Sequence, residues 1–317
     1  MNLAAATTTT TTTKRVNLAK YLIIIAGPTG VGKTDLSIGI AKHFGAEILS
    51  CDSRQFYREL GVGVAKPTAE QMNEVKHHFI DNVSVTKRYS IWQYENDAIK
   101  LLDEYFKTHD YAVMCGGSGL YIDAVCNGID LMPDPDPVIR QEVIDLYNEK
   151  GIEALRFELQ RIDPEYYAQV DLKNPQRIMR GIEMTRQTDK PFSQFRTNTR
   201  QERPFETIKI LINTDRNILY DRINRRVDIM LEHGLVEEAR NLLKYKGMTA
   251  LRTIGYLELF DYFDGKTSLE EAVELIKRNS RRYARRQITW FHKNNDYIEC
   301  EPNENKIINI IEEKSKL

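Results

Sequence analysis

The chain has little that would indicate a secreted, metal-stabilised or membrane-spanning protein. No two of its four cysteines form a C-x-x-C pair; they are Cys51, Cys115, Cys126 and Cys300. This scatter argues against a zinc site or a disulfide framework and fits a reducing cytosol. The longest apolar runs are far shorter than the ~20 residues that cross a membrane. We therefore expect a cytoplasmic protein without a membrane segment.

An excess of charge is also missing. The 45 Lys and Arg residues nearly balance the 46 Asp and Glu residues, which gives a net charge of −1. Nothing global predicts nucleic-acid binding, so any such binding must come from a local cluster. With 41% hydrophobic and 29% charged residues, the 317-residue chain has the composition of an ordinary soluble protein of one large or two smaller domains.

The N-terminal segment lacks the apolar core of a secretory signal. It contains seven consecutive threonines, Thr7 to Thr13. We interpret residues 1–20 as a disordered Thr-rich tail. A transit peptide is the alternative, since the segment has no acidic residue, although Lys14, Arg15 and Lys20 are its only charges.

The strongest motif is a complete G-x-x-x-x-G-K-T pattern between an apolar run and a helical sequence. Its glycines let several backbone N–H groups point at one cluster of oxyanions, and the following helix adds its positive end. Lys33 supplies a point charge, and the Thr34 hydroxyl is placed to hold Mg²⁺. A chance glycine turn would lack this context, so we predict a site for a di- or triphosphate. Its residues are Gly27, Pro28, Thr29, Gly30, Val31, Gly32, Lys33 and Thr34.

Two other segments follow expected strands. Asp52 comes directly after a short strand over 46–51, and a glycine turn over 116–119 follows a strand over 111–115. Ligands of open parallel sheets gather at the carboxyl ends of the strands, so the Asp52 carboxylate can face the phosphate loop. From its position alone, Asp52 is equally expected to cap the next helix instead. The glycine turn lets the backbone approach a ligand closely.

The chain changes in character at three alternating prolines over 133–137, which cannot continue a strand or helix. Polar helical sequence follows over Val138–Lys150 and Ile152–Arg161 and in a helix that Asn174 and Pro175 begin, and strand character returns at Ile208–Ile212. We predict an α/β fold, with a P-loop NTPase-like parallel sheet core flanked by helices and an all-helical insertion domain. The expected segments are the tail 1–20, the first part of the core 21–133, the helical insertion 134–200, and the second part of the core 201–317 with a C-terminal basic helix.

Arginines gather on two expected helices. Arg222 and Arg226 lie four residues apart, which is usually a solvated basic face. Phosphate-loop proteins, however, often need an arginine to neutralise the leaving phosphates. The last long helix carries six cations over 277–286, which we call the basic stripe, and it has no acidic residue from there to Trp290. Because a solvated stripe usually alternates with acids, this pattern favours RNA binding, with aromatics such as Tyr283 able to stack on bases.

These pieces occur in an order that closely resembles the bacterial tRNA dimethylallyltransferases, also called tRNA isopentenyltransferases. The resemblance extends from about Leu22 to Trp290; only the phosphate loop is specific alone, whereas the ordered set is very specific. The segments are Gly27–Thr34, Asp52–Gln55, Ala65–Pro67, Gly116–Tyr121, Pro175–Arg177, Ile254–Tyr256 and Arg285–Trp290.

The family transfers a dimethylallyl group from dimethylallyl diphosphate to N6 of adenosine 37 in tRNAs that read codons beginning with U. The resemblance implies that the phosphate loop and Mg²⁺ hold the diphosphate leaving group rather than ATP. It implies Asp52 as the general base. Thr29, Lys33 and Arg226 are the other implied catalytic residues, which steady the diphosphate.

The implied partner is the anticodon stem-loop of tRNA, and we expect a monomer. One departure is visible, because the family commonly has Thr where this chain has Ser118, a change that keeps the hydroxyl. The residues implied to contact tRNA are Asp52, Ser53, Arg54, Gln55, Ser118, Arg140, Gln176, Arg177, Arg180, Arg281, Arg282, Arg285, Arg286 and Gln287.

Three other functions are compatible with a phosphate loop. An adenylate isopentenyltransferase would do the same chemistry on a free nucleotide, which needs neither the helical insertion nor the basic stripe. A small-molecule P-loop kinase would use the loop for ATP and would leave the acid-free stripe unexplained. The non-enzymatic alternative is an RNA-binding GTPase or ATPase module; the sequence has no N-K-x-D guanine motif, which argues against a GTPase.

Overall fold

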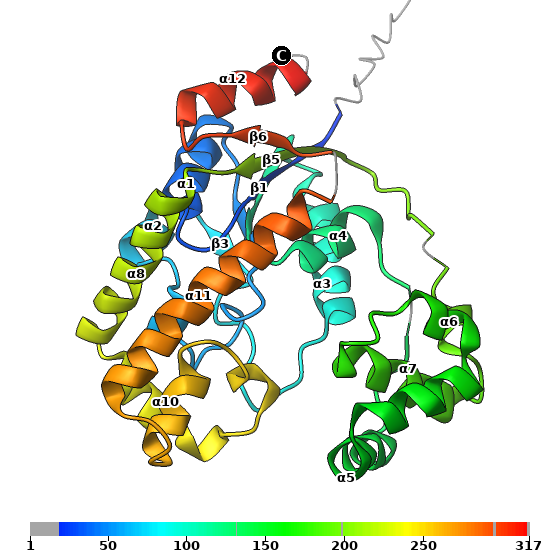
Figure 1. The fold of residues 1–317 in the computed structure, drawn as a ribbon. Helices are drawn as coiled ribbons and strands as arrows, with labels where there is room; N and C mark the ends of the chain where they lie inside the picture. The colour runs from blue at the N-terminus through cyan, green and yellow to red at the C-terminus, as the bar shows by residue number, and fades with distance from the viewer. Residues whose placement is uncertain (1–18, 131, 198, 294–295, 316–317) are drawn as a thin grey trace, which may run out of the picture. The chain divides into compact units, whose positions relative to one another are not determined.

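The computed structural model describes residues 19–130, 132–197, 199–293 and 296–315 (Figure 1). Nearly all of the predicted tail therefore lies outside the described residues. The chain forms two compact units. The core unit extends to Arg88 and includes Ala98–Gly119 and the chain from Pro204 onward. The helical unit consists of Tyr89–Asp97 and Leu120–Arg203, a wider range than the expected insertion at 134–200.

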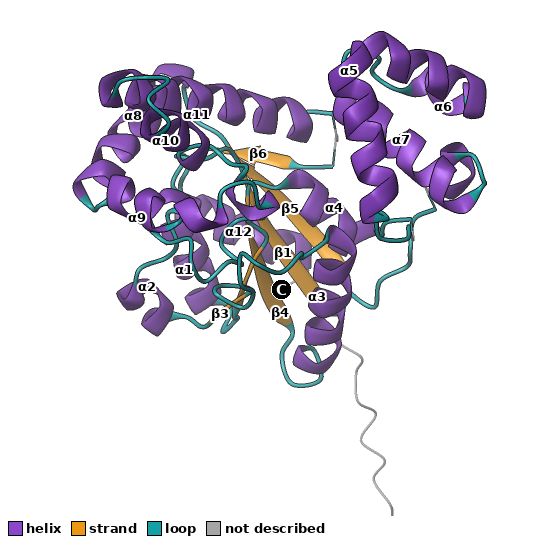
Figure 2. Cartoon of the chain, turned by 90° about the horizontal axis from the view of Figure 1, so that it is seen from below, coloured by secondary structure: helices purple, strands orange, loops and turns teal. Residues whose placement is uncertain are grey.

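Six strands of the described residues form one parallel sheet in the order β3-β2-β4-β1-β5-β6, which confirms the predicted fold class. A parallel sheet covered on both faces is built from continuous apolar strands, and every residue of the central strand β1 is buried. Strands β1, β4 and β5 lie side by side in Figure 2. The strands are β1 (Tyr21–Ala26), β2 (Ile48–Ser50), β3 (His77–His78), β4 (Tyr111–Gly116), β5 (Glu206–Ile212) and β6 (Ile298–Cys300).

The register of the sheet brings the two glycine segments together. Ala26 at the end of β1 pairs with Gly116 at the end of β4, so the phosphate loop and the glycine turn start at the same side of the sheet, where the strands have their carboxyl ends. The edge strands β3 and β6 were not predicted, because segments of two and three residues are too short to show a periodic pattern.

Helices of the core unit cover the sheet and build a second apolar cluster. Ile23 and Ile25 of β1 pack with side chains of α1, α8, α11 and α12. A separate cluster joins the loop around Leu60 to α9, α10 and the start of α11. The helices are α1 (Lys33–His43), α2 (Ala69–Glu74), the second half of α3 (Ile91–Tyr105), α8 (Arg216–Glu232), α9 (Leu235–Asn241), α10 (Tyr256–Phe263), α11 (Leu269–Phe291) and α12 (Glu304–Ser315), with short turns η1 (Val62–Val64), η3 (Leu243–Tyr245) and η4 (Thr249–Leu251).

The helical unit follows the predicted start signals. The Asn174 side chain accepts a hydrogen bond from the Arg177 amide at the start of α7, and Asp136 caps α5 in the same way. Gly151 (φ 73°) interrupts α5 where the sequence predicted two helices. The core of the helical unit includes Leu155, Leu159, Ile178 and Ile182. The remaining elements are α4 (Gly119–Asn127), α5 (Pro137–Ile162), α6 (Pro164–Gln169), α7 (Pro175–Thr188) and η2 (Phe192–Phe195). Among the described helices, none combines the length and the apolar character that a membrane crossing requires.

A buried ion pair lies within the helical unit. Arg203 Nη2 donates to Glu95 Oε1 at 2.6 Å and to the Ala124 carbonyl at 2.9 Å, and the two side chains are 9% and 7% exposed. We expect Glu95→Ala to lower the free energy of unfolding by about 3–5 kcal/mol, because it leaves a buried guanidinium without its charged partner. Urea denaturation measures this loss. The control is Lys107→Ala, whose exposed pair with Glu104 should contribute about 1 kcal/mol or less; equal losses would contradict the prediction.

Candidate functional site

The phosphate loop is held by side chains that come from the second half of the chain. Arg226 of α8 donates from Nη1 to the Thr29 hydroxyl at 3.0 Å. Within the loop, Lys33 Nζ donates to the Pro28 carbonyl at 2.8 Å. Gly30 has a left-handed backbone (φ +82°), and a Cβ atom there would lie 2.9 Å from a side-chain carbon of α8. The loop and α8 are therefore in direct contact, as a shared anion site requires.

Gln287 of α11 joins the phosphate loop to the second glycine turn. Its Oε1 accepts a hydrogen bond from the Thr29 amide at 2.9 Å, and its Nε2 donates to the Gly117 carbonyl at 2.9 Å. A Cβ atom on Gly117 would lie 2.1 Å from that nitrogen, so only glycine allows this approach. The side chain of Gln287 is buried. The structure thus places this predicted tRNA contact inside the protein, between two loops.

Asp52 follows β2 and serves two purposes at once. Its Oδ1 accepts a hydrogen bond from the Arg54 amide at 2.9 Å, which stabilises a turn over 53–56. No helix begins at this turn, so the alternative that Asp52 caps a following helix is wrong. The same side chain lines both cavities of the site. The next residue, Ser53, donates from its amide to the Ser118 hydroxyl at 3.3 Å, so the Asp52 segment also contacts the glycine turn.

Two cavities of about 380 Å³ each meet at this point in the core unit. The phosphate cavity is lined by the phosphate loop, including Lys33 and Thr34. The apolar cavity has a floor of buried side chains and an exposed rim that includes Arg252, Leu257 and Arg286. The floor consists of Val64, Ile223, Val227, Leu235 and Ile276. The residues common to both cavities are Thr29, Asp52, Arg226 and Tyr283.

The electrostatics of the junction favour an anionic ligand. Burial lowers the pKa of Lys33, and the nearby Arg226 charge lowers it further, whereas Asp52 opposes the shift. Burial also lowers the pKa of Arg226, again opposed by Asp52. Burial and the Asp52 charge raise the pKa of Tyr283 to about 12. Neither cation forms an ion pair within 4 Å in the described part of the chain, so a bound anion would supply the missing charge.

Residues 55–294 match the IPP transferase family. The chain belongs to this family. It is 46% identical to the tRNA dimethylallyltransferase of Cytophaga hutchinsonii over 93% of this chain and 97% of that protein. It is 47% identical to the tRNA dimethylallyltransferase of Christiangramia forsetii over 94% and 99%.

Solved structures of the family share the fold. The full-length tRNA isopentenylpyrophosphate transferase of Bacillus halodurans superposes with a TM-score of 0.70 at 36% identity, over 94% of this chain and 97% of that chain. A eukaryotic dimethylallyltransferase acting on tRNA has a TM-score of 0.72 at 22% identity, over 91% and 75%, and shows the fold alone. The recognition from ordered motifs is thereby confirmed, and the chain is a transferase of this family.

The basic stripe on α11 divides into two groups. Lys277 pairs with Asp228 of α8 at 2.7 Å, and Arg281 hydrogen-bonds Asn224 of the same helix. These two side chains stabilise the α8–α11 contact, and the two helices lie side by side in Figure 1. The other members are exposed and form no ion pair with any described residue; they are Arg278, Arg282, Arg285 and Arg286.

Two predicted tRNA contacts near Asp52 bind the protein itself. Arg54 donates from its guanidinium to the carbonyls of Thr249 and Arg252 at 3.0 and 3.3 Å. Gln55 donates to the Ala65 carbonyl at 3.1 Å. The Arg54 contacts fix a loop at the apolar cavity, and the Gln55 contact fixes a loop at the phosphate cavity. A role toward tRNA stays a prediction for both side chains.

The remaining predicted contacts, Arg140, Gln176, Arg177 and Arg180, lie in the helical unit. Arg140 and Arg180 each lie 3.7 Å from Oε2 of the buried Glu183. Gln176 and Arg177 are exposed in the first turn of α7. The other predicted contacts lie in the core unit.

The sequence pattern did not identify Tyr283 as a wall of the site or the apolar floor as a cavity. Helical spacing over α8 predicts that Ile223, Val227 and Met230 are buried; the structure confirms this for Ile223 and Val227, whereas Met230 is only half-buried. A periodic pattern, however, does not distinguish a side chain in a packed core from one beneath a cavity.

We expect Gln287→Leu to weaken the binding of inorganic diphosphate about tenfold. The change leaves the Thr29 amide and the Gly117 carbonyl without their partner, and an unpaired buried group costs about 1–3 kcal/mol. Isothermal titration calorimetry measures the affinity. The matched control is Thr289→Val on the exposed side of the same helix, which removes only a bond to the Arg285 carbonyl. Parental affinity in Gln287→Leu would contradict the bridging role.

Proposed function

We propose that this chain transfers a dimethylallyl group from dimethylallyl diphosphate to N6 of adenosine 37 in tRNAs that read codons beginning with U, releasing diphosphate. The observation that carries the proposal is the meeting of a cationic phosphate cavity and an apolar cavity at Asp52. A donor with an anionic head and a short hydrocarbon tail fits that arrangement. The names of the relatives, at 46–47% identity over nearly the whole chain, support the same reaction.

The phosphate cavity would receive the diphosphate. Lys33 and Arg226 would stabilise the negative charge that grows on the leaving group as the allylic C–O bond breaks. Their positions are already set by the Pro28 carbonyl and the Thr29 hydroxyl, so little reorganisation is needed during the reaction.

The phosphate cavity also fits Mg²⁺. This ion usually binds substrate phosphates with few protein ligands and keeps several waters. The Thr34 hydroxyl and the Asp52 carboxylate both line the cavity and are oxygen donors of the kind that Mg²⁺ prefers. Mg²⁺ bound beside Thr34 would neutralise part of the diphosphate charge.

The apolar cavity would hold the five-carbon group. Its buried floor replaces water around a carbon that becomes positive while the leaving group departs. Excluding water matters here, because water would otherwise capture the dimethylallyl group in place of the adenine amine.

Asp52 would accept the proton from the amine that attacks. Its Oδ1 is held by the Arg54 amide, and Oδ2 forms no hydrogen bond with the described residues, which leaves it able to accept one. A base stacked in the anticodon loop cannot reach this position, so the adenosine must leave the stack. The exposed arginines of α11 would bind the surrounding phosphates, and this attraction weakens with salt. The four free cysteines support the cytoplasm as the site of action.

The deciding experiment supplies Mg²⁺, labelled dimethylallyl diphosphate and unmodified tRNA, with AMP as a competing acceptor. We expect label in tRNA and not in AMP, and nucleotide mapping should place it at N6 of adenosine 37. Label in AMP would favour a free-nucleotide transferase. Phosphorylation of a small acceptor by ATP would favour a kinase.

We expect Asp52→Ala to abolish transfer, and Asp52→Asn to lower kcat about 10²- to 10⁴-fold, because each removes the proton acceptor. The affinity for tRNA, measured by filter binding, should remain within about threefold, since phosphate contacts supply most of it. Asp110→Asn, which disrupts a surface pair with Lys20, is the control. Turnover near the parental rate in Asp52→Asn would remove Asp52 from the role of base.

A further inference from the structure

One short loop contributes to the walls of both cavities. We call residues 61–67 the wall loop. Gly63 and Val64 line the apolar cavity, and Ala65, Lys66 and Pro67 line the phosphate cavity. A displacement of this loop would therefore change the space for the hydrocarbon and for the diphosphate together.

A carboxylate outside both cavities binds the wall loop from α9. Glu238 Oε2 accepts hydrogen bonds from the amides of Gly61 and Val62 at 3.0 and 2.8 Å, and Oε1 accepts one from the Gly63 amide at 2.9 Å. The hydroxyl of Tyr256 donates to Oε1 at 2.6 Å. Three successive amides facing one side form a concavity for an anion, and here the protein fills it with its own side chain.

The packing on this side leaves no room for movement. A Cβ atom on Gly63 would lie 2.6 Å from the ring and hydroxyl of Tyr256. Tyr256 is fully buried, and burial together with the Glu238 charge raises its pKa, so the hydroxyl keeps the proton that it donates. The wall loop cannot move toward α10 without a clash.

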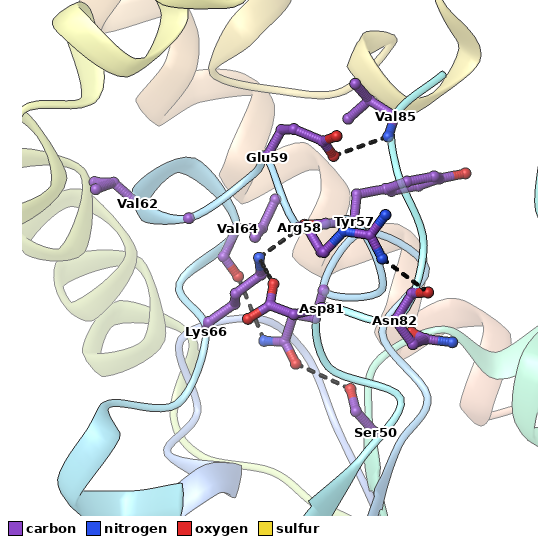
Figure 3. A network of polar contacts seen from close by, with 12 residues as sticks. Ser50, Tyr57, Arg58, Glu59, Val62, Val64, Lys66, Asp81, Asn82 and Val85 are labelled. Carbon is purple, nitrogen blue, oxygen red and sulfur yellow. Dashed lines mark hydrogen bonds and ion pairs between the residues drawn. The ribbon is translucent and has the colours of Figure 1, made fainter. Parts of the chain in front are cut away.

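The inner side of the wall loop is tied to the segment that carries Asp52. Gln55 Nε2 donates to the carbonyls of Val64 and Ala65 at 3.4 and 3.1 Å, and its Oε1 accepts a hydrogen bond from Ser50 at 2.9 Å. Ser50 and Val64 lie on either side of this link in Figure 3.

Lys66 anchors the end of the wall loop. Its Nζ donates to the Tyr57 carbonyl at 2.7 Å and pairs with Asp81, as Figure 3 shows. The lysine charge is thus used within the protein. The loop is consequently fixed on the inside by Gln55 and Lys66, and on the outside by Glu238.

We propose that Glu238 is a positioning residue for the transfer reaction, which holds the wall loop where Val64 and Ala65 fit the dimethylallyl diphosphate. The inference rests on the proposed function for the identity of the donor. Glu238 lines neither cavity, so it acts through the backbone of the loop and does not touch the substrate. Nothing in the ordered motifs of the sequence indicates this role.

Glu238→Gln tests the proposal. One oxygen becomes an NH₂ group that cannot accept a hydrogen bond and that faces backbone donors. We expect KM for dimethylallyl diphosphate to rise at least fivefold and kcat/KM to fall at least tenfold. Hydrogen exchange at the amides of residues 61–63 should accelerate. Tyr256→Phe, which removes one of the four hydrogen bonds, should shift the same quantities in the same direction by less.

The matched control is Glu59→Gln. Glu59 also accepts a backbone hydrogen bond, from the Val85 amide at 2.9 Å (Figure 3), and one from the Ser84 hydroxyl at 2.6 Å. Ser84 and Val85 line neither cavity. The assay temperature is one at which circular dichroism shows every variant to be folded. There, Glu59→Gln should keep the parental KM and kcat, although its Tm falls by about as much as that of Glu238→Gln.

Two results would overturn the inference. One is a Glu238→Gln variant with the parental KM and kcat/KM; the other is an equal kinetic loss in Glu59→Gln, which would indicate general destabilisation. Calorimetry with dimethylallyl diphosphate separates this inference from the proposed function. If the parent binds the donor, transfers nothing to tRNA, and Glu238→Gln weakens binding, the function fails and the positioning role stands. Unchanged donor binding in Glu238→Gln refutes the positioning role whatever the acceptor is.

Discussion

Two half-buried cations beside a single carboxylate are the constraint on which the rest of the site depends. Lys33 and Arg226 are both largely shielded from water, and the Asp52 charge raises the pKa of each, against the lowering by burial. Shielded charges are costly unless they are paired, so this arrangement depends on strong hydrogen bonds, and a bound anion would complete it. The contacts to the Pro28 carbonyl and the Thr29 hydroxyl provide those hydrogen bonds.

The parallel sheet creates this arrangement by aligning strand ends that are distant in sequence. Asp52 follows β2, the glycine turn follows β4, and the phosphate loop follows β1, all at the carboxyl ends of the strands. Helices α8 and α11 then add Arg226 and Gln287 from the second half of the chain. The wall loop closes the same space and is itself fixed from α9 by Glu238. The reaction proposed here therefore depends on side chains from nearly every part of the core unit.

Local signals predicted most of the elements. The phosphate loop, the Asn174 cap, the break at Gly151 and the run of β1 each depend on residues within a few positions of one another. The arginines of α11 show why the same reasoning stops short. Spacing placed Arg281 and Arg282 in one stripe, yet Arg281 binds Asn224 of α8 and Arg282 is exposed. The two arginines differ because α8 packs against the side of α11 that carries Arg281, and the sequence of α11 does not show this packing.

By itself, the sequence determined the phosphate loop, the parallel α/β core, the basic helix and, through the order of its motifs, the family. These features are encoded in neighbouring residues, whose conformational preferences act locally. Tertiary structure alone decided that Gln287 is buried between two loops, that Asp52 lines two cavities at once, and that Glu238 binds three amides of the wall loop. Those contacts join residues up to 258 positions apart, and no local pattern can specify such a pairing, because it exists only when the whole core has packed.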